Sequence, residues 1–117
     1  NAGYKTAEWF RNFVLRRNAV VNVGECAFCI NASPGVVVED NRIFNDQQQP
    51  HTAVMIHRGN KGPGDADDRD AVVHGNVACF PSGESTQVAL KLASPGARVS
   101  DNLTLTGDAA TRGVCAR

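Results

Sequence analysis

Four cysteines constrain the fold of this 117-residue chain more than any other feature. They are Cys26, Cys29, Cys79 and Cys115, an even number in a short chain, which is typical of two disulfide bonds formed in an oxidising compartment. Cys26 and Cys29 lie in an apolar run that predicts a β-strand, where residues three apart point to opposite faces. We therefore expect a crossed arrangement, in which these two cysteines bond separately to Cys79 and Cys115.

The spacing of Cys26 and Cys29 also raises two alternatives, redox catalysis and a zinc site. A thioredoxin-like motif would lie at the start of a helix, where the helix end lowers the thiol pKa, whereas β-forming residues flank these cysteines. A structural zinc site would need a second close pair, and Cys79 and Cys115 are far apart in the sequence. We favour a structural disulfide framework and expect no cofactor.

Length and charge place the chain in the class of small single-domain proteins. Residues 1–117 suffice for one hydrophobic core. Twelve basic and twelve acidic side chains cancel, so the sequence carries no strong signal for nucleic-acid binding. No apolar run is long enough to span a bilayer. Together with a first residue other than methionine, these features predict one disulfide-stapled, secreted, extracellular domain whose signal peptide has been removed.

Hydrophobic periodicity predicts one helix followed by many strands. Residues 6–17 carry an apolar stripe, a Thr6 cap and two arginines in the last turn, as an amphipathic helix would. The segments expected as strands are residues 19–30, 36–44, 52–57, 71–80, 86–92, 98–106 and 113–116. We expect a mainly β fold, an antiparallel β-sandwich or small barrel of about seven strands, with the N-terminal helix packed on a sheet. An α+β fold is the alternative.

An internal repeat links residues 32–41 with residues 93–102. Both segments contain Ala-Ser-Pro-Gly, then a valine and then Asp-Asn in the same register. Proline sets φ at the first corner of a turn, and glycine accepts the positive φ of the second corner. The repeat therefore predicts one hairpin used twice.

The segment from His57 to Gly75 contains most of the candidate site residues. A hairpin closing over residues 59–70 would bring His57 and His74 together. Long loops in compact domains are uncommon unless they bind something. The candidate ligand-binding residues in this loop are Arg58, Asn60, Lys61, Asp65 and Asp67. An alternative calcium site would use Asp65, Asp67, Asp68 and Asp70, although the glycine and glutamate of an EF-hand loop are missing.

Three stretches resemble, in order, part of the fungal guanyl-specific ribonucleases. They are Ser33-Pro34-Gly35, Arg42-Ile43-Phe44-Asn45 and Ala53-Val54-Met55-Ile56-His57-Arg58-Gly59. The resemblance implies phosphate contact by Arg42 and general acid catalysis by His57. The predicted hairpin would add His74 to the same site, so a small secreted ribonuclease is the alternative function.

Other catalytic motifs are missing from the sequence, including the nucleophile elbow, the P-loop, the dinucleotide-binding fingerprint and the zinc-protease motif. We therefore favour a secreted binding or interaction protein that acts without turnover, such as an effector, a toxin or a carbohydrate-binding module. Its expected partner is a host or cell-surface protein or a glycan.

Overall fold

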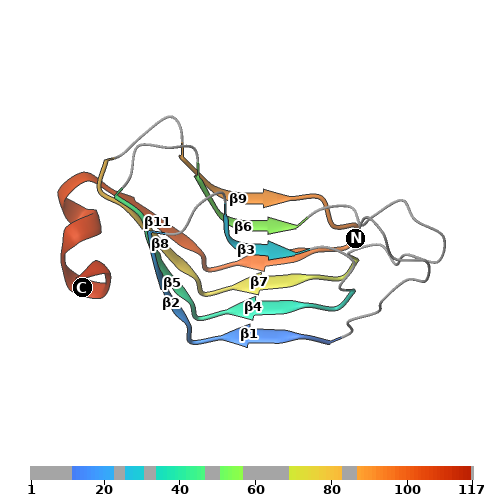
Figure 1. Cartoon of the computed structure of the whole chain (residues 1–117). Coiled ribbons are helices and arrows are strands. Elements are labelled where there is room, and N and C mark those ends of the chain that lie inside the picture. The colour runs from blue at the N-terminus through green and yellow to red at the C-terminus, as the bar shows by residue number, and fades with distance from the viewer. Residues whose placement is uncertain are drawn as a thin grey trace.

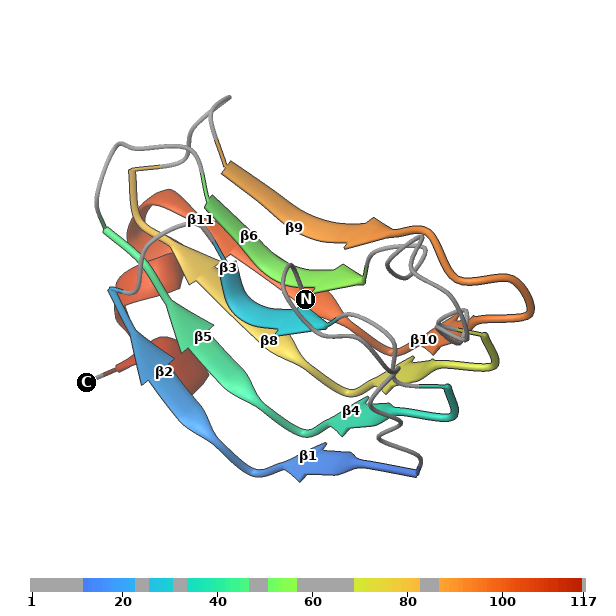
Figure 2. The same cartoon turned by 45° about the vertical axis from the view of Figure 1, so that its right-hand side comes forward.

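The computed structural model is a short parallel β-solenoid, in which the chain winds through three sheets in turn (Figure 1). The structure describes residues 12–22, 26–30, 34–46, 51–56, 69–82 and 87–116, except for the side chains of residues 87–91. Every strand pair within these ranges is parallel. Figure 2 shows how successive coils stack, so that each strand lies beside its equivalent in the next coil.

The strands form three sheets, which we call A, B and C. Sheet A has the order β1 (Val14–Arg16), β4 (Val37–Glu39), β7 (Val72–His74), β10 (Arg98–Ser100). Sheet B has the order β11 (Leu103–Thr106), β8 (Val77–Phe80), β5 (Arg42–Phe44), β2 (Ala19–Val21). Sheet C has the order β3 (Cys26–Ile30), β6 (His51–Ile56), β9 (Gln87–Leu92). The chain ends in two short 3-10 helices, η1 (Gly107–Thr111) and η2 (Gly113–Cys115).

The main core lies inside the solenoid, between the three sheets. Val38 and Val73 are register partners in sheet A, Ile43 and Ala78 are partners in sheet B, and Val54 comes from sheet C. All five are buried. Because parallel coils place equivalent residues above one another, each inward position becomes a column of apolar side chains, and stacking of coils buries what one coil would expose.

The predicted antiparallel sandwich or barrel is wrong, and so is the predicted N-terminal helix where the structure describes it. Parallel pairing arises because the neighbour of each strand comes one coil later in the chain, not after a hairpin. Residues 14–16 form β1, which pairs with β4. Residues 6–11 lie outside the described ranges. Those ranges contain 3-10 helices but no α-helix, so the α+β alternative is also wrong.

Most predicted strand segments do contain strands, but four of them are divided between two sheets. Residues 19–30 supply β2 to sheet B and β3 to sheet C, and the other three are divided by a bend between sheets A and B. Residues 36–44, 71–80 and 98–106 each supply one strand to sheet A and the next strand to sheet B. At the bend, the residue before an asparagine has a positive φ, which is 54° at Asp40 and 69° at Gly75. The Asp-Asn of the internal repeat is therefore a corner between two sheets.

The hairpin predicted at each Ser-Pro-Gly is also wrong. Pro34 and Gly35 form the turn that leads from sheet C into β4, and Pro95 and Gly96 form the equivalent turn before β10. The strands on either side of each turn belong to different sheets and do not pair with each other. Residues 113–116, expected as a strand, contain η2.

The C-terminal segment packs on the outer face of sheet B, beside the solenoid (Figure 1). Phe44 and Cys79 point away from the main core and form a second buried cluster with Ala110 and Cys115. A disulfide joins Cys79 to Cys115 with a Cα–Cα distance of 5.9 Å. This bond ties the C-terminal segment to β8.

The crossed disulfide arrangement is wrong, although all four cysteines are bonded. Cys26 is joined to Cys29, and their Cα atoms are 5.6 Å apart. A fully extended strand would separate these atoms by about 10 Å, so the backbone of β3 must curl between them. The expectation failed because it assumed a straight strand through residues 26–29.

Candidate functional site

A ladder of four asparagines fixes the bend between sheets A and B. Its members are Asn18, Asn41, Asn76 and Asn102. Each side-chain oxygen from Asn41 onward accepts two hydrogen bonds from the asparagine one coil earlier, from its backbone N–H and from its Nδ2, at 2.9–3.1 Å. Two of the four, Asn41 and Asn76, are almost completely buried.

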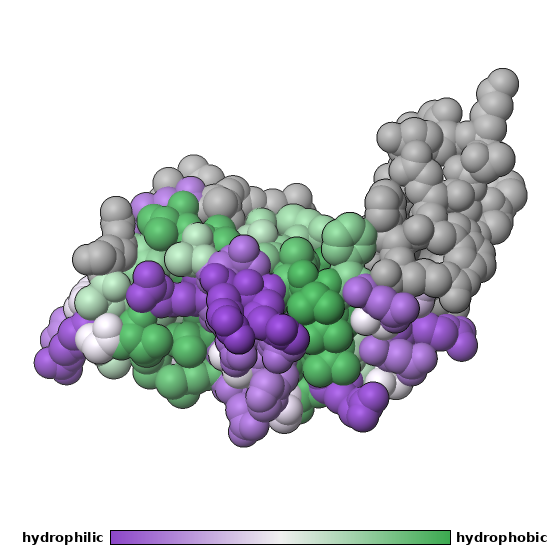
Figure 3. Space-filling model, turned by 90° about the horizontal axis from the view of Figure 1, so that it is seen from below, coloured by the Kyte–Doolittle hydropathy of each residue, from purple (hydrophilic) through white to green (hydrophobic). Residues whose placement is uncertain are grey.

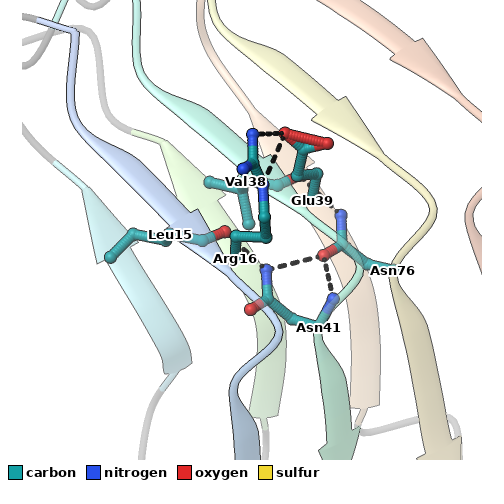
Figure 4. A network of polar contacts seen from close by, with 6 residues as sticks. All are labelled: Leu15, Arg16, Val38, Glu39, Asn41 and Asn76. Atoms are coloured by element: carbon teal, nitrogen blue, oxygen red, sulfur yellow. Dashed lines mark hydrogen bonds and ion pairs between the residues drawn. The ribbon is translucent and has the colours of Figure 1, made fainter.

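The ladder also satisfies backbone carbonyls of the preceding coil. Nδ2 of Asn41 donates to the Leu15 carbonyl, and Nδ2 of Asn76 donates to the Val38 carbonyl (Figure 4). Asn102 makes the same bond to Val73. Buried polar groups are costly when unpaired, so this arrangement holds each coil in one register relative to the next.

That register aligns the outward side chains of sheet A in two rows. The polar row consists of Arg16, Glu39, His74 and Ser100, and the second row consists of Val14, Val37, Val72 and Arg98. Adjacent strands lie about 4.7–4.9 Å apart, so one side chain of each row recurs at that interval. Both rows therefore run across the strands, along the direction in which the coils stack.

Side chains within the polar row hold one another in place. Arg16 donates from Nη2 and Nε to Glu39 Oε1, at 2.7 and 3.1 Å (Figure 4). His74 Nδ1 lies 2.9 Å from Ser100 Oγ and 3.6 Å from Asp101 Oδ2. The side chains of Arg16 and His74 remain 47% and 42% exposed, so the row is both ordered and accessible.

Sheets B and C offer less open surface than sheet A. Sheet B has Phe44 and Cys79 buried under η1 and η2, and all six residues of β6 in sheet C are buried. In sheet A, none of the outward residues of the two rows is buried. Within the described ranges, sheet A is therefore the face best suited to contact a partner.

The residues of the ribonuclease hypothesis are not assembled where the structure describes them. Arg42 extends from the outer face of sheet B, where its Nη1 donates to the carbonyls of Val114 and Ala116 at 3.2 and 3.5 Å. His74 lies on sheet A, and His57 is outside the described ranges. The predicted hairpin between the strands of the two histidines is absent, because β6 pairs with β3 and β9 while β7 pairs with β4 and β10.

The predicted ligand-binding residues Arg58, Asn60, Lys61, Asp65 and Asp67 all lie outside the described ranges, as does Asp68 of the calcium set. Asp70 is described and forms the corner before β7, with φ of 59°. Its backbone N–H donates to the Pro95 carbonyl at 2.9 Å. Asn12, Gly35 and Gly96 form the equivalent corners of the other coils, also with positive φ. Asp70 therefore belongs to a corner of the solenoid. The other residues of the calcium set lie outside the described ranges, so the calcium site stays a prediction.

Neither the asparagine ladder nor the polar row of sheet A was predicted from the sequence. The signal available in the sequence was an apolar residue, a polar residue, then arginine, aspartate or glycine, and finally asparagine. It occurs four times, at residues 15–18, 38–41, 73–76 and 99–102. The intervals between the asparagines are 23, 35 and 26 residues, and this unequal spacing hides the repeat.

Comparison with known proteins gives no matching family model, curated protein or solved structure. Within the described ranges, no helix has the length and apolar character needed to cross a membrane. The function must therefore be argued from the geometry of the solenoid itself.

Proposed function

We propose that this chain is a secreted binding protein that holds an extended glycan against the outer face of sheet A and acts without turnover. The observation that carries the proposal is the polar row of Arg16, Glu39, His74 and Ser100, aligned across the coils and open to solvent. The two disulfides are compatible with an extracellular location.

The chemistry of the two rows suits a sugar chain. Hydroxyl groups both donate and accept hydrogen bonds, and the polar row offers donors on Arg16, an acceptor on Glu39 and both functions on His74 and Ser100. Beside it, Val37 and Val72 offer an apolar strip for the C–H face of a sugar ring. A polymer lying along the rows would meet a new pair of side chains at every coil.

The rigidity of the solenoid supports binding as the activity. Ordering flexible side chains at an interface costs free energy, and that cost is smaller where the side chains are already held. Arg16 is fixed by Glu39, and His74 is fixed by Ser100. The ladder directly beside the row holds the strands that carry these residues.

A glycan array probed with the 117-residue chain tests the proposal. Binding should appear on an extended glycan and weaken by about tenfold in H74A and E39Q, since each removes a contact worth about 1–1.5 kcal/mol. R16A should also weaken binding, whereas R112A, which removes an exposed arginine from the C-terminal segment, should leave it unchanged. Circular dichroism should show the same fold for all variants.

Other outcomes would contradict the proposal. Cell binding that persists after enzymatic removal of glycans would indicate a protein partner instead. Glycan binding with equal affinity in H74A, E39Q and R16A would place the site elsewhere. RNA cleavage that is lost in H57A would establish the ribonuclease alternative.

A further inference from the structure

The two ends of the asparagine ladder carry complementary hydrogen-bonding groups. Each coil donates to the next, so within the described chain Asn18 Oδ1 has no earlier asparagine to accept from. At the other end, the N–H of Asn102 and one hydrogen of its Nδ2 have no later asparagine to donate to. The donors at the end formed by β10 and β11 therefore match the acceptor at the end formed by β1 and β2.

The strands at the two ends have matching geometry as well. Among the described strands, β1 and β10 are the two edges of sheet A, and β2 and β11 are the two edges of sheet B. Edge strands present unpaired backbone N–H and C=O groups that can pair with another strand. Continuing the register of the coils would place β10 beside β1 and β11 beside β2 of a second copy, with Asn102 beside Asn18.

The same register would bring opposite charges together. Asp101 and Arg17 are the positive-φ residues before Asn102 and Asn18, so they are equivalent positions of the first and last coils. Both are exposed, and the Asp101 side chain is 79% exposed. A second copy stacked in register would therefore place the Asp101 carboxylate against an Arg17 guanidinium.

Both ends also expose apolar side chains. Figure 3 views the end formed by β1 and β2, and shows apolar areas on either side of a polar band. Val14 and Val21 are 48% and 44% exposed at this end, and Val99 and Leu103 are 46% and 48% exposed at the opposite end. Val99 belongs to the inward column of sheet A, above Val73, so a further coil would cover it as other coils cover Val73.

The C-terminal helices leave this end open. η1 and η2 lie against the outer face of sheet B, where Cys115 bonds Cys79, and not across β10 and β11 (Figure 1). The edge strand β10 accordingly has all three of its residues exposed.

We propose that this chain binds a second copy of itself head to tail, with β10 and β11 of one copy pairing with β1 and β2 of the next. Because the contact joins two different surfaces, the association does not close at two copies and continues into longer linear assemblies. Each added copy would extend the two rows of sheet A by four strands.

A charge-exchange experiment tests the contact. Sedimentation velocity of the full chain over a range of concentrations should show mass increasing with concentration and falling with added salt, because the Asp101–Arg17 contacts are exposed to solvent. D101R and R17D should each weaken association at least tenfold by opposing like charges. Position 17 already holds arginine and position 101 aspartate at the same backbone conformation, so both variants should fold.

Mixing the two variants provides the decisive measurement. In the mixture, every D101R–R17D contact again joins an arginine to an aspartate, so association should return to near the level of the unmodified chain. V99D, which places a charge on the apolar end of the core column, should abolish association and should not be rescued by mixing. A constant monomer mass at all concentrations, or association unchanged by D101R, R17D and V99D, would overturn the proposal.

Discussion

The bend between sheets A and B and the connection from sheet C to sheet A contrast sharply in this molecule. The bend has two residues in every coil, a positive-φ residue and a ladder asparagine, as at Gly75 and Asn76. The connection from sheet C to sheet A covers residues 31–36 in one coil, 57–71 in the next and 93–97 in the last. The bend between sheets A and B therefore has the same length in every coil, whereas the connection from sheet C to sheet A varies widely in length.

The contrast indicates where the register of the coils is set. At the bend, Asn41 and Asn76 each bond both neighbouring coils, so a change of length there would disconnect several buried polar groups. The connection is joined to its neighbours through corners such as Gly35 and Asp70, whose backbone N–H groups bond the next coil. Extra residues between these corners and sheet C leave the ladder unchanged.

The largest expected effect comes from removing a central asparagine. N76A would leave the N–H and Nδ2 of Asn41 without their acceptor and the Val38 carbonyl without its donor. An unsatisfied buried polar group costs about 1–3 kcal/mol, so we expect the free energy of unfolding to fall by about 3–5 kcal/mol. Urea denaturation followed by circular dichroism measures this change.

N18A is the matched control at the exposed end of the same ladder. It removes one hydrogen bond to Asn41 Oδ1 but keeps the backbone N–H of residue 18 as a donor. We expect a loss below about 1 kcal/mol. Equal losses for N76A and N18A would show that the ladder does not set the stability of the bend.

A smaller effect is expected at the glycine of the same bend. A Cβ built on Gly75 would lie 2.5 Å from Asp40 Oδ1, at a φ of 69°. G75A therefore adds a steric conflict to the cost of a left-handed alanine, which is about 1–2 kcal/mol. Gly107 has φ of 62° and no heavy atom within 4 Å of its Cβ position, so G107A should show the backbone cost alone.

The steric part can be isolated by combining two substitutions. In a D40G background the side chain that meets residue 75 is removed, so G75A should then cost no more than G107A. Thermal unfolding of the four variants compares these values. If D40G leaves the cost of G75A unchanged, the conflict with Asp40 does not contribute to it.

The sequence allowed prediction of local features but not of how they connect. Alternating apolar residues correctly indicated strands through residues 71–80 and 98–106, and the Pro-Gly pairs correctly indicated turns. The chain direction after each turn was not predictable, because Pro34 and Gly35 can begin a hairpin or a corner between sheets equally well. Parallel pairing joins residues 23 to 36 positions apart, and local patterns carry no information about such distant partners.

The site was less predictable than the fold. His74 was identified as a candidate residue, but with His57 as its expected neighbour, whereas the parallel register places it between Glu39 and Ser100. Arg16 and Glu39 were not predicted as site residues, because they are 23 residues apart and become neighbours only through coil stacking. Sites built on outward rows of a solenoid depend on the repeat length, which varies here.

The smallest expected effect comes from shortening the long connection. Deleting residues 59–67 reduces residues 57–71 to the length of residues 31–36, which already joins sheet C to sheet A in the preceding coil. Each doubling of loop length costs only about 0.6 kcal/mol in closure entropy, so the deletion should change the free energy of unfolding by less than about 1 kcal/mol. The same variant distinguishes two candidate binding surfaces, the long connection and the polar row of sheet A. The deletion removes Asn60 and Asp65 of the connection but leaves His74 of the polar row in place. Glycan binding retained by this variant and lost in H74A would assign recognition to sheet A, whereas binding lost on deletion alone would assign it to the connection.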